Sequence, residues 1–384
     1  MLLCLFDKFK GTLTSLQANA LGCECASPLG WQCSAVELTD GGDGFVQALT
    51  HAAGGKLVSV PCHDPLFRPI HAPVGVVFSG NKQSQAETKT RVVLEMATAS
   101  GLLRLSVDER NPLRATTKGT GELILAALEF TPQEVLLGIG GSATNDLGLG
   151  ALEALGLQAF DEAGNLVTPL VPQAFSRVAR FNGNAVPPLG LLKIACDVTN
   201  PLLGPNGCTR VFGGQKGLKP QDFDDVERLL HRLAVLLLQT TGKSQSLLNA
   251  AGSGAAGGIG FGLTLFGATL VPGFETVARW INLDEKLHQA KVILTGEGCF
   301  DFSSLSGKGP AELLRRAASQ NPNATLMLIA GKLEPGAVEA LQHELKRPIL
   351  ARSLIPFNEE KLPTAEETER LFKHHSTELF RELQ

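Results

Sequence analysis

Residues 2–7 read Leu-Leu-Cys-Leu-Phe-Asp, a short apolar run that ends on an acidic residue. Two later stretches repeat this pattern: residues 192–197 read Leu-Lys-Ile-Ala-Cys-Asp, and residues 292–297 read Val-Ile-Leu-Thr-Gly-Glu. Short apolar runs of this kind predict buried strands. Because open parallel sheets bind ligands outside the carboxyl ends of their strands, the three terminal acids are candidates for metal binding or base catalysis. A helix N-cap or a solvated turn carboxylate is the simpler interpretation of each.

The rest of the chain alternates similar apolar runs with longer amphipathic stretches. We expect strands at residues 2–6, 34–39, 71–78, 91–96, 134–139, 191–196, 291–295, 325–330 and 347–352. We expect helices at residues 14–26, 43–53, 120–129, 223–239, 308–319, 335–345 and 365–382. Apolar side chains in residues 223–239 recur at the helical spacing, and Thr364 with Glu367 forms a capping box. This alternation predicts α/β layers with largely parallel sheets.

The composition is that of a folded protein, and the length predicts two or three domains. The chain has 384 residues, 43% of them hydrophobic and 19% charged, which excludes long-range disorder. Its net charge of −4 offers no basic excess for nucleic acids or anionic membranes. The apolar residues 2–6 are too few for a signal peptide, and glycines interrupt the charge-poor residues 244–274 too often for a membrane span. The eight cysteines match no zinc spacing and suit a reducing compartment, so we expect a cytoplasmic protein.

Glycine is enriched, and the excess is clustered. There are 42 glycines, and they concentrate in residues 41–44, 138–146, 252–258 and 296–298. Glycine lets backbone N–H groups approach an anion closely, and a following helix N-terminus adds a favourable dipole. Together with acids for Mg²⁺ and scattered lysines, such clusters are typical of phosphoryl transfer. Each cluster taken alone is equally compatible with tight turns.

Sharper nucleotide motifs are absent or weak. Gly242-Lys243-Ser244 matches the end of the P-loop pattern G-x-x-x-x-G-K-[ST]. The pattern fails because Leu237 stands where its first glycine belongs. The dinucleotide fingerprint does have a match, Gly138-x-Gly140-x-x-Ala143 after an expected strand, with Asp161 about twenty residues further on. A nucleotide-linked oxidoreductase therefore stays open as a second class of function. The absence of G-x-S-x-G and H-E-x-x-H removes the commonest hydrolase and zinc-protease classes.

A series of short motifs runs through the whole chain in a recognisable order. They occupy residues 7–13, 39–44, 115–124, 138–146, 195–202, 212–217, 254–258, 295–298 and 307–308. This ordered set resembles the bacterial glycerate kinase family, the type I group that is similar to glycerate 2-kinases. The resemblance implies phosphorylation of D-glycerate with ATP and Mg²⁺, usually to 2-phosphoglycerate, with 3-phosphoglycerate as the other possible product.

The resemblance also implies two α/β domains. We expect a discontinuous Rossmann-like domain built from residues 1–65 and 275–384, and a second α/β domain inserted as residues 66–274. The implied partners are the small molecules glycerate and ATP, and the chain is expected to act as a monomer or a homodimer.

Within this resemblance, individual residues receive expected roles. Asp197 is the expected catalytic base or water-mediated Mg²⁺ ligand, and Lys10 is expected to steady the transferred phosphoryl group or the substrate carboxylate. Glu297 and Asp301 are the expected metal ligands. The expected substrate- and phosphate-binding residues are Asp43, Gly140, Gly141, Ser142, Thr144, Asn145, Lys216 and Lys308.

The chain departs from the family pattern after Gly298. Residues 299–304 read Cys-Phe-Asp-Phe-Ser-Ser, so Asp301 is kept while Phe302 and Ser303 replace polar residues of the family. This departure keeps a third class of function open, a ligand-binding protein that has the fold and has lost turnover.

Overall fold

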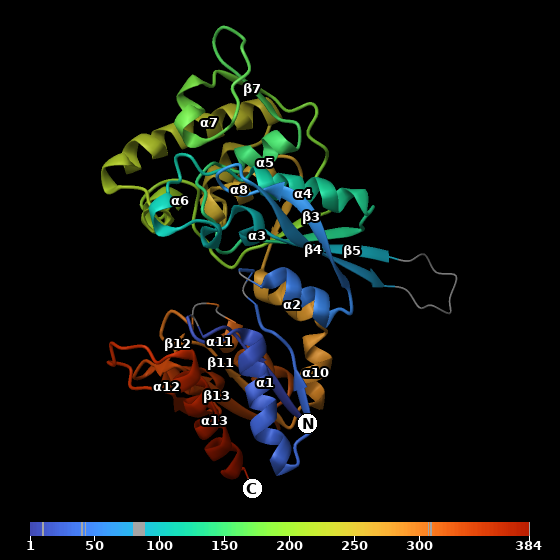
Figure 1. The fold of residues 1–384 in the computed structure, drawn as a ribbon, viewed down its shortest axis with the longest axis vertical. Coiled ribbons are helices and arrows are strands. Elements are labelled where there is room, and N and C mark those ends of the chain that lie inside the picture. Colours follow the sequence, from blue (N-terminus) through green and yellow to red (C-terminus); the bar gives the residue numbers. More distant parts are fainter. Residues whose placement is uncertain are drawn as a thin grey trace. The chain divides into compact units, whose positions relative to one another are not determined.

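The structure is a computed structural model that describes residues 1–384 except Lys10, Asp40, Asp43, residues 80–88, Ser306, Lys308 and Gln384. Contacts divide the chain into two compact units. One, the terminal unit, consists of Met1–Asp40 and Phe274–Gln384; the other, the central unit, is Gly41–Gly273. In Figure 1 the terminal unit carries the blue and the orange-to-red ends of the colour scale.

The terminal unit is built on a five-stranded sheet in the order β15-β13-β11-β1-β2. All of its neighbouring strands pair in parallel. Its strands are β1 (Leu2–Phe6), β2 (Cys33–Ala35), β11 (Val292–Gly296), β13 (Thr325–Ala330) and β15 (Leu350–Ser353), and β12 (Cys299–Phe300) pairs separately with β14 (Lys332–Leu333). Its helices are α1 (Ser15–Ala26), α9 (Gly273–Trp280, which begins on the last residue of the central unit), α10 (Leu283–Gln289), α11 (Gly309–Gln320), α12 (Ala337–Leu345) and α13 (Ala365–Arg381).

The central unit contains a six-stranded sheet in the order β10-β9-β6-β5-β4-β3. The first four strands of that order are parallel, and β5, β4 and β3 form an antiparallel meander. Its strands are β3 (Lys56–His63), β4 (Pro69–Ser79), β5 (Lys89–Glu95), β6 (Glu134–Gly138), β9 (Leu192–Ala195) and β10 (Thr269–Val271), with β7 (Gln158–Phe160) and β8 (Arg180–Asn182) as a separate pair. Its helices are α2 (Phe45–Ala52), α3 (Ala97–Ser100), α4 (Lys118–Glu129), α5 (Leu149–Ala154), α6 (Cys208–Phe212), α7 (Phe223–Thr241) and α8 (Ile259–Thr264).

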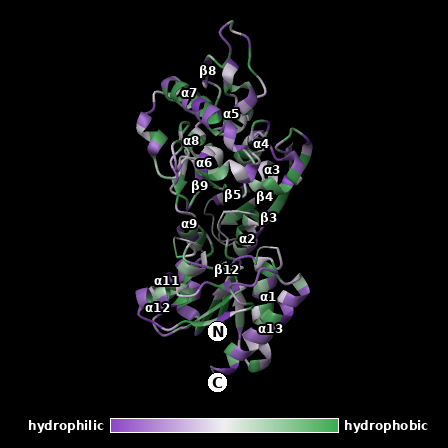
Figure 2. Cartoon of the chain, turned by 90° about the vertical axis from the view of Figure 1, so that its left-hand side faces the viewer, coloured by the Kyte–Doolittle hydropathy of each residue, from purple (hydrophilic) through white to green (hydrophobic). Residues whose placement is uncertain are grey.

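Each unit has its own hydrophobic core. Figure 2 shows hydrophobic residues along strands such as β3 and β4, and many hydrophilic residues on helices such as α7 and α12. In the terminal unit the ring of Phe372 from α13 packs against Phe6 and Phe9, at centroid distances of 5.1 and 5.9 Å. These buried rings attach the last helix to the first strand of the chain.

Several sequence predictions are confirmed locally. The helix predicted at residues 223–239 is α7, whose buried side chains lie on one apolar face. Thr364 and Glu367 form the predicted capping box at the start of α13. Among the helices of the described residues, none combines the length and the apolar character that a membrane crossing requires.

The unit boundaries differ from the expected ones. We expected the first boundary near residue 65, whereas the contacts place it between Asp40 and Gly41. The physical reason is that β3 pairs with β4 along its whole length, from Lys56 opposite Val76 to His63 opposite Pro69. Residues 41–65 therefore belong with the central unit. The second boundary, between Gly273 and Phe274, differs from the expected one by a single residue.

Candidate functional site

The glycine-rich loop, residues 138–146, follows β6 and is held tightly by its neighbours in the central unit. The N–H of Gly140 donates to the carbonyl of Gly41 (2.9 Å), and the N–H of Leu102 donates to the carbonyl of Gly141 (2.8 Å). A Cβ added to Gly140 would lie 2.6 Å from the Cα of Gly42. Glycine is thus required at residue 140 because two backbones touch there, and the amide of Gly140 is already used inside the fold.

Lys216 brings the polar part of this loop together. Its side chain is 2% exposed, and Nζ donates to Ser142 Oγ (2.8 Å) and to the carbonyl oxygen of Thr144 (2.6 Å). Asn145 Nδ2 donates to Thr209 Oγ1 of α6 at 3.0 Å. Four expected site residues, which we call the Lys216 cluster (Ser142, Thr144, Asn145 and Lys216), are therefore neighbours in the fold.

The environment of Lys216 is unusual for an ammonium group. Burial lowers the pKa of Lys216 to about 8, while the nearby Cys208 and Asp146 act in the opposite direction. A desolvated ammonium gains more from an anionic partner than an exposed one does. Lys216 is therefore suited to hold a carboxylate or phosphate that comes from solution.

Two further polar atoms of the cluster have no hydrogen-bond partner among the described residues. Thr144 Oγ1 and Asn145 Oδ1 are buried, and no hydrogen-bond partner is found for either within the described part of the chain. A buried polar atom without a partner costs about 1–3 kcal/mol, so native folds rarely keep one without a reason. A hydroxyl donor, an amide acceptor and an ammonium group on these neighbouring residues are the group types that fit a small hydroxylated anion.

Asp146, at the end of the glycine-rich loop, has a structural role. Its buried carboxylate accepts hydrogen bonds from the N–H and Oγ1 of Thr117 (2.9 and 2.8 Å) and from the N–H groups of Gly148 and Gly150 (3.1 and 3.3 Å). Burial raises the pKa of Asp146, and these hydrogen bonds oppose the rise. The residue ties the loop to Thr117, the residue before α4. Sequence reasoning missed Thr117 and Thr209, because no local pattern marks a hydroxyl that acts across the fold.

Asp197 follows β9 in the central unit and is exposed. Its Oδ1 accepts a hydrogen bond from the N–H of Gly273 at 2.7 Å, where α9 begins. Asp197 therefore contacts the start of a helix that is distant in sequence, and no helix begins directly after it, so it is not the N-cap of a following helix. A carboxylate that is exposed to solvent can still accept a proton, so the geometry is compatible with a base.

Glu297 and Asp301 lie in the terminal unit. Glu297 comes directly after β11 and is buried, 7% exposed. Asp301 Oδ1 accepts a hydrogen bond from the N–H of Ser304 (2.9 Å) and one from the hydroxyl of Ser303. The departure at Ser303 therefore supplies a hydroxyl that orients the retained acid, whereas the side chain of Phe302 is 51% exposed.

The expected site residues divide between the two units. Asp197, Gly140, Gly141 and the Lys216 cluster belong to the central unit, and Glu297 and Asp301 belong to the terminal unit. The remaining expected residues, Lys10, Asp43 and Lys308, lie outside the described residues.

The dinucleotide fingerprint does not have the structural setting that it needs. The loop after β6 leads to α5, which begins only at Leu149 and has six residues. A dinucleotide-binding turn instead opens a helix directly at the third glycine position, here Ala143. The structure therefore gives no support to the oxidoreductase alternative.

Comparisons with known proteins agree with the expected family. The model of the glycerate kinase family matches residues 2–384. A glycerate kinase of Bacillus subtilis (strain 168) is 35% identical over 344 residues, which cover 88% of this chain and 86% of the relative. A glycerate 2-kinase of Escherichia coli (strain K12) is 37% identical over 284 residues, which cover 72% and 70%.

The fold has a counterpart among solved structures. A crystal structure of a candidate glycerate kinase 2 from Salmonella typhimurium LT2 is similar with a TM-score of 0.77 and 29% identity, covering 100% of this chain and 98% of that chain. The predicted α/β fold class is thereby confirmed.

Proposed function

Because this chain belongs to the glycerate kinase family, we propose that it transfers the γ-phosphoryl group of ATP to a hydroxyl of D-glycerate. The proposed product is 2-phosphoglycerate, and 3-phosphoglycerate is the alternative that the experiment below separates. The observation that carries the proposal is the Lys216 cluster, in which a buried ammonium group lies beside two buried polar atoms without partners in the described part of the chain.

The cluster suits the chemistry of this substrate. Glycerate is a small anion with weakly acidic hydroxyl groups, so its kinase needs a cation for the carboxylate or the phosphates and a base near the attacking hydroxyl. Lys216 supplies the cation in a desolvated setting, where its attraction to an anion is strengthened. The hydroxyl of Thr144 and the amide oxygen of Asn145 are of the types that pair with a carboxylate and a hydroxyl, respectively.

Asp197 is the proposed base. Its anchored carboxylate would accept the proton of the attacking hydroxyl while Lys216 and the glycine-rich loop hold the reacting groups. Glu297 and Asp301 are the proposed Mg²⁺ ligands, since oxygen donors of this kind suit that ion. When bound, Mg²⁺ supplies charge neutralisation at the ATP phosphates. Lys10, Asp43 and Lys308 remain further candidates from the sequence.

The test of the activity is a coupled ADP-release assay with ATP, Mg²⁺ and D-glycerate, with the product identified by ³¹P NMR. Turnover with D-glycerate supports the proposal, and the position of the phosphate separates the two products. Folded protein that releases no ADP with D-glycerate contradicts it. L-glycerate and other small hydroxy acids then distinguish a changed substrate from a protein that only binds.

The role of Asp197 is tested by Asp197→Asn. Asparagine keeps the oxygen that accepts from Gly273 but is not a base, so we expect the rate to fall by a factor of about 10²–10⁴. Asp225→Asn, on the exposed part of α7, is the matched control. A loss smaller than about threefold would leave Asp197 with the hydrogen bond to Gly273 as its role and would contradict its role as base.

A further inference from the structure

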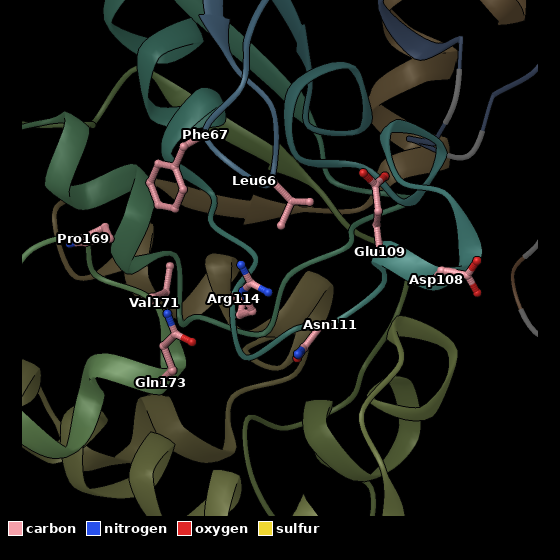
Figure 3. Close-up of a pocket in the computed structure, with 9 residues that line it drawn as sticks. All are labelled: Leu66, Phe67, Asp108, Glu109, Asn111, Arg114, Pro169, Val171 and Gln173. Carbon is pink, nitrogen blue, oxygen red and sulfur yellow. The ribbon is translucent and has the colours of Figure 1, made fainter.

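A second site lies in the central unit, apart from the Lys216 cluster. Figure 3 shows a pocket whose lining side chains surround an open space of about 500 Å³. Phe67, Leu66 and Val171 provide apolar surface, and Asn111, Gln173 and Arg114 provide polar groups. The volume lies within the range of about 300–1,000 Å³ that is common for sites of drug-sized ligands. It is several times what a three-carbon acid fills, so glycerate alone does not account for it.

Arg114 is the basic group of this pocket, whose lining also includes Asp108 and Glu109. Its guanidinium points into the open space in Figure 3, and no ion pair or side-chain hydrogen bond is found for it within the described residues. Of the two acids at the rim, Glu109 is already paired with Arg68 at 2.8 Å, and Asp108 lies on the side away from Arg114. A guanidinium group in this setting favours a phosphate or carboxylate partner, which it can bind through two parallel hydrogen bonds.

The remaining lining residues define the rest of the ligand. The ring of Phe67 with Leu66 and Val171 gives a surface against which a flat heteroaromatic ring can pack. The amides of Asn111 and Gln173 each carry donors and an acceptor. Asn111 Oδ1 already accepts from the N–H of Leu113 (3.0 Å), so its NH₂ group is the part suited to a ligand. The apolar slot matches a nucleobase ring, the two amides match the polar edge of that ring, and the guanidinium group matches a phosphate.

The wall of the pocket is attached to the Lys216 cluster. A Cβ added to Gly217 would lie 2.1 Å from the carbonyl oxygen of Arg110, so the chain beside Asn111 touches the turn that carries Lys216. The same segment continues through Arg114 to Thr117, whose N–H and hydroxyl donate to Asp146 at the end of the glycine-rich loop. The segment that lines the pocket is therefore joined by backbone contacts to the turn that carries Lys216 and by Thr117 to the end of the glycine-rich loop.

We propose that this pocket binds the nucleoside part of the phosphoryl donor, with Arg114 neutralising phosphate charge. The proposal rests on the proposed kinase function for the identity of the donor. The residues that line the pocket are not among those of the proposed glycerate site.

The test is binding of MgADP to the full chain by titration calorimetry, in the wild type and two variants. Arg114→Gln removes the charge, and Gln173→Trp fills the pocket from its exposed rim. We expect each to weaken MgADP binding by about tenfold or more, the usual effect of losing a charge-assisted contact. Arg177→Gln, an exposed arginine outside the pocket, is the matched control and should stay within about twofold of the wild type.

Kinetics then identify the nucleotide. For the donor site, the KM for ATP rises in both variants while the KM for glycerate stays within about twofold. Loss of MgADP binding with an unchanged KM for ATP overturns the donor assignment. Unchanged MgADP binding in both variants, or no MgADP binding to the wild type at millimolar concentration, overturns the assignment of the pocket as a nucleotide site. If the wild type binds MgADP and turns over no substrate, the variants still test the pocket, and only the proposed function fails.

Discussion

Replacing Lys216 by methionine should leave the fold stable and remove most of the activity. Burial lowers the pKa of Lys216 from its ordinary value of 10.5 to about 8. At 1.36 kcal/mol per pKa unit, holding this group charged in the folded state at pH 7 costs on the order of 3 kcal/mol. Methionine has a similar length and no charge, so the variant escapes this cost.

The variant also loses two hydrogen bonds. Without Nζ, the carbonyl of Thr144 is left without its 2.6 Å partner, a loss of about 1–3 kcal/mol. The hydroxyl of Ser142 can rotate toward another acceptor. Because the gain and the loss are similar, we expect the free energy of unfolding of Lys216→Met at pH 7 to stay within about 2 kcal/mol of the wild type. Because Lys216 is proposed to hold the reacting anion, its loss should lower kcat by about 10²–10³.

The pH dependence provides an independent check. Between pH 8 and 10.5 the unfolded chain keeps the Lys216 proton, whereas the folded protein has released it. The unfolded state then binds more protons, so this group makes stability rise with pH across that window, by up to about 3 kcal/mol. The charged form is the one proposed to act, so kcat/KM should fall as the pH rises through about 8.

The assay combines urea denaturation at pH 7 and pH 10 with the coupled kinase assay. The difference between wild type and variant cancels the other groups that titrate in this range. Lys219→Met removes an exposed charge three residues away and should change neither quantity. The reasoning is refuted if Lys216→Met loses more than about 4 kcal/mol, keeps activity within threefold, or shows the same rise in stability with pH as the wild type.

Three further predictions concern other parts of the chain. The Asp146 carboxylate accepts hydrogen bonds from four N–H and O–H donors, and Asp146→Asn would place an amide NH₂ among these donors. The substitution should lower the free energy of unfolding, measured in urea, by about 2–4 kcal/mol. A loss under 1 kcal/mol would contradict the structural role of Asp146. The hydrogen bond with the Cys4 thiol lowers the pKa of Cys23 to about 7, so its alkylation by iodoacetamide, followed by peptide mass spectrometry, should have a midpoint near pH 7. Burial raises the pKa of Cys33 to about 11, so Cys33 should stay slow at that pH, and equal rates would speak against both assignments. Phe372→Ala should lower the free energy of unfolding by about 3–5 kcal/mol. The control is Leu362→Ala, which changes an exposed side chain. Equal melting temperatures for the two variants would show that the buried ring cluster is not stabilising.

Local patterns in the sequence were sufficient for most of the longer helices, for many of the strands and for the family, but they missed β3 (Lys56–His63). The helical spacing of apolar residues predicted α7, which the structure has as Phe223–Thr241, because burial of one helix face leaves a period that survives in any fold. The capping box of Thr364 was readable because both partners lie within one turn. The ordered motifs predicted the family that matches residues 2–384.

The interpretation of single residues needed the fold. Gly140 is a typical phosphate-loop glycine in the sequence, yet its amide donates to Gly41 and its Cα packs on Gly42. Asp146 and Asp197 both follow strand regions in the sequence. Only the structure shows that Asp146 is buried and accepts four hydrogen bonds, whereas Asp197 is exposed and accepts one from Gly273. The residue type is the same in both positions, so the surroundings of the carboxylate decide its function.

The sequence by itself determined the α/β class, most of the helices and strands, and the family, since each of these depends on short-range periodicity or on the order of motifs. Only the tertiary structure decided that Lys216 lies against Ser142, 74 residues earlier in the chain, that residues 41–65 join the central unit, and that Arg114 points into a pocket. These contacts join residues that are far apart along the chain. The free energy that stabilises these contacts comes from burial and from pairing across the fold, so local sequence patterns do not predict them.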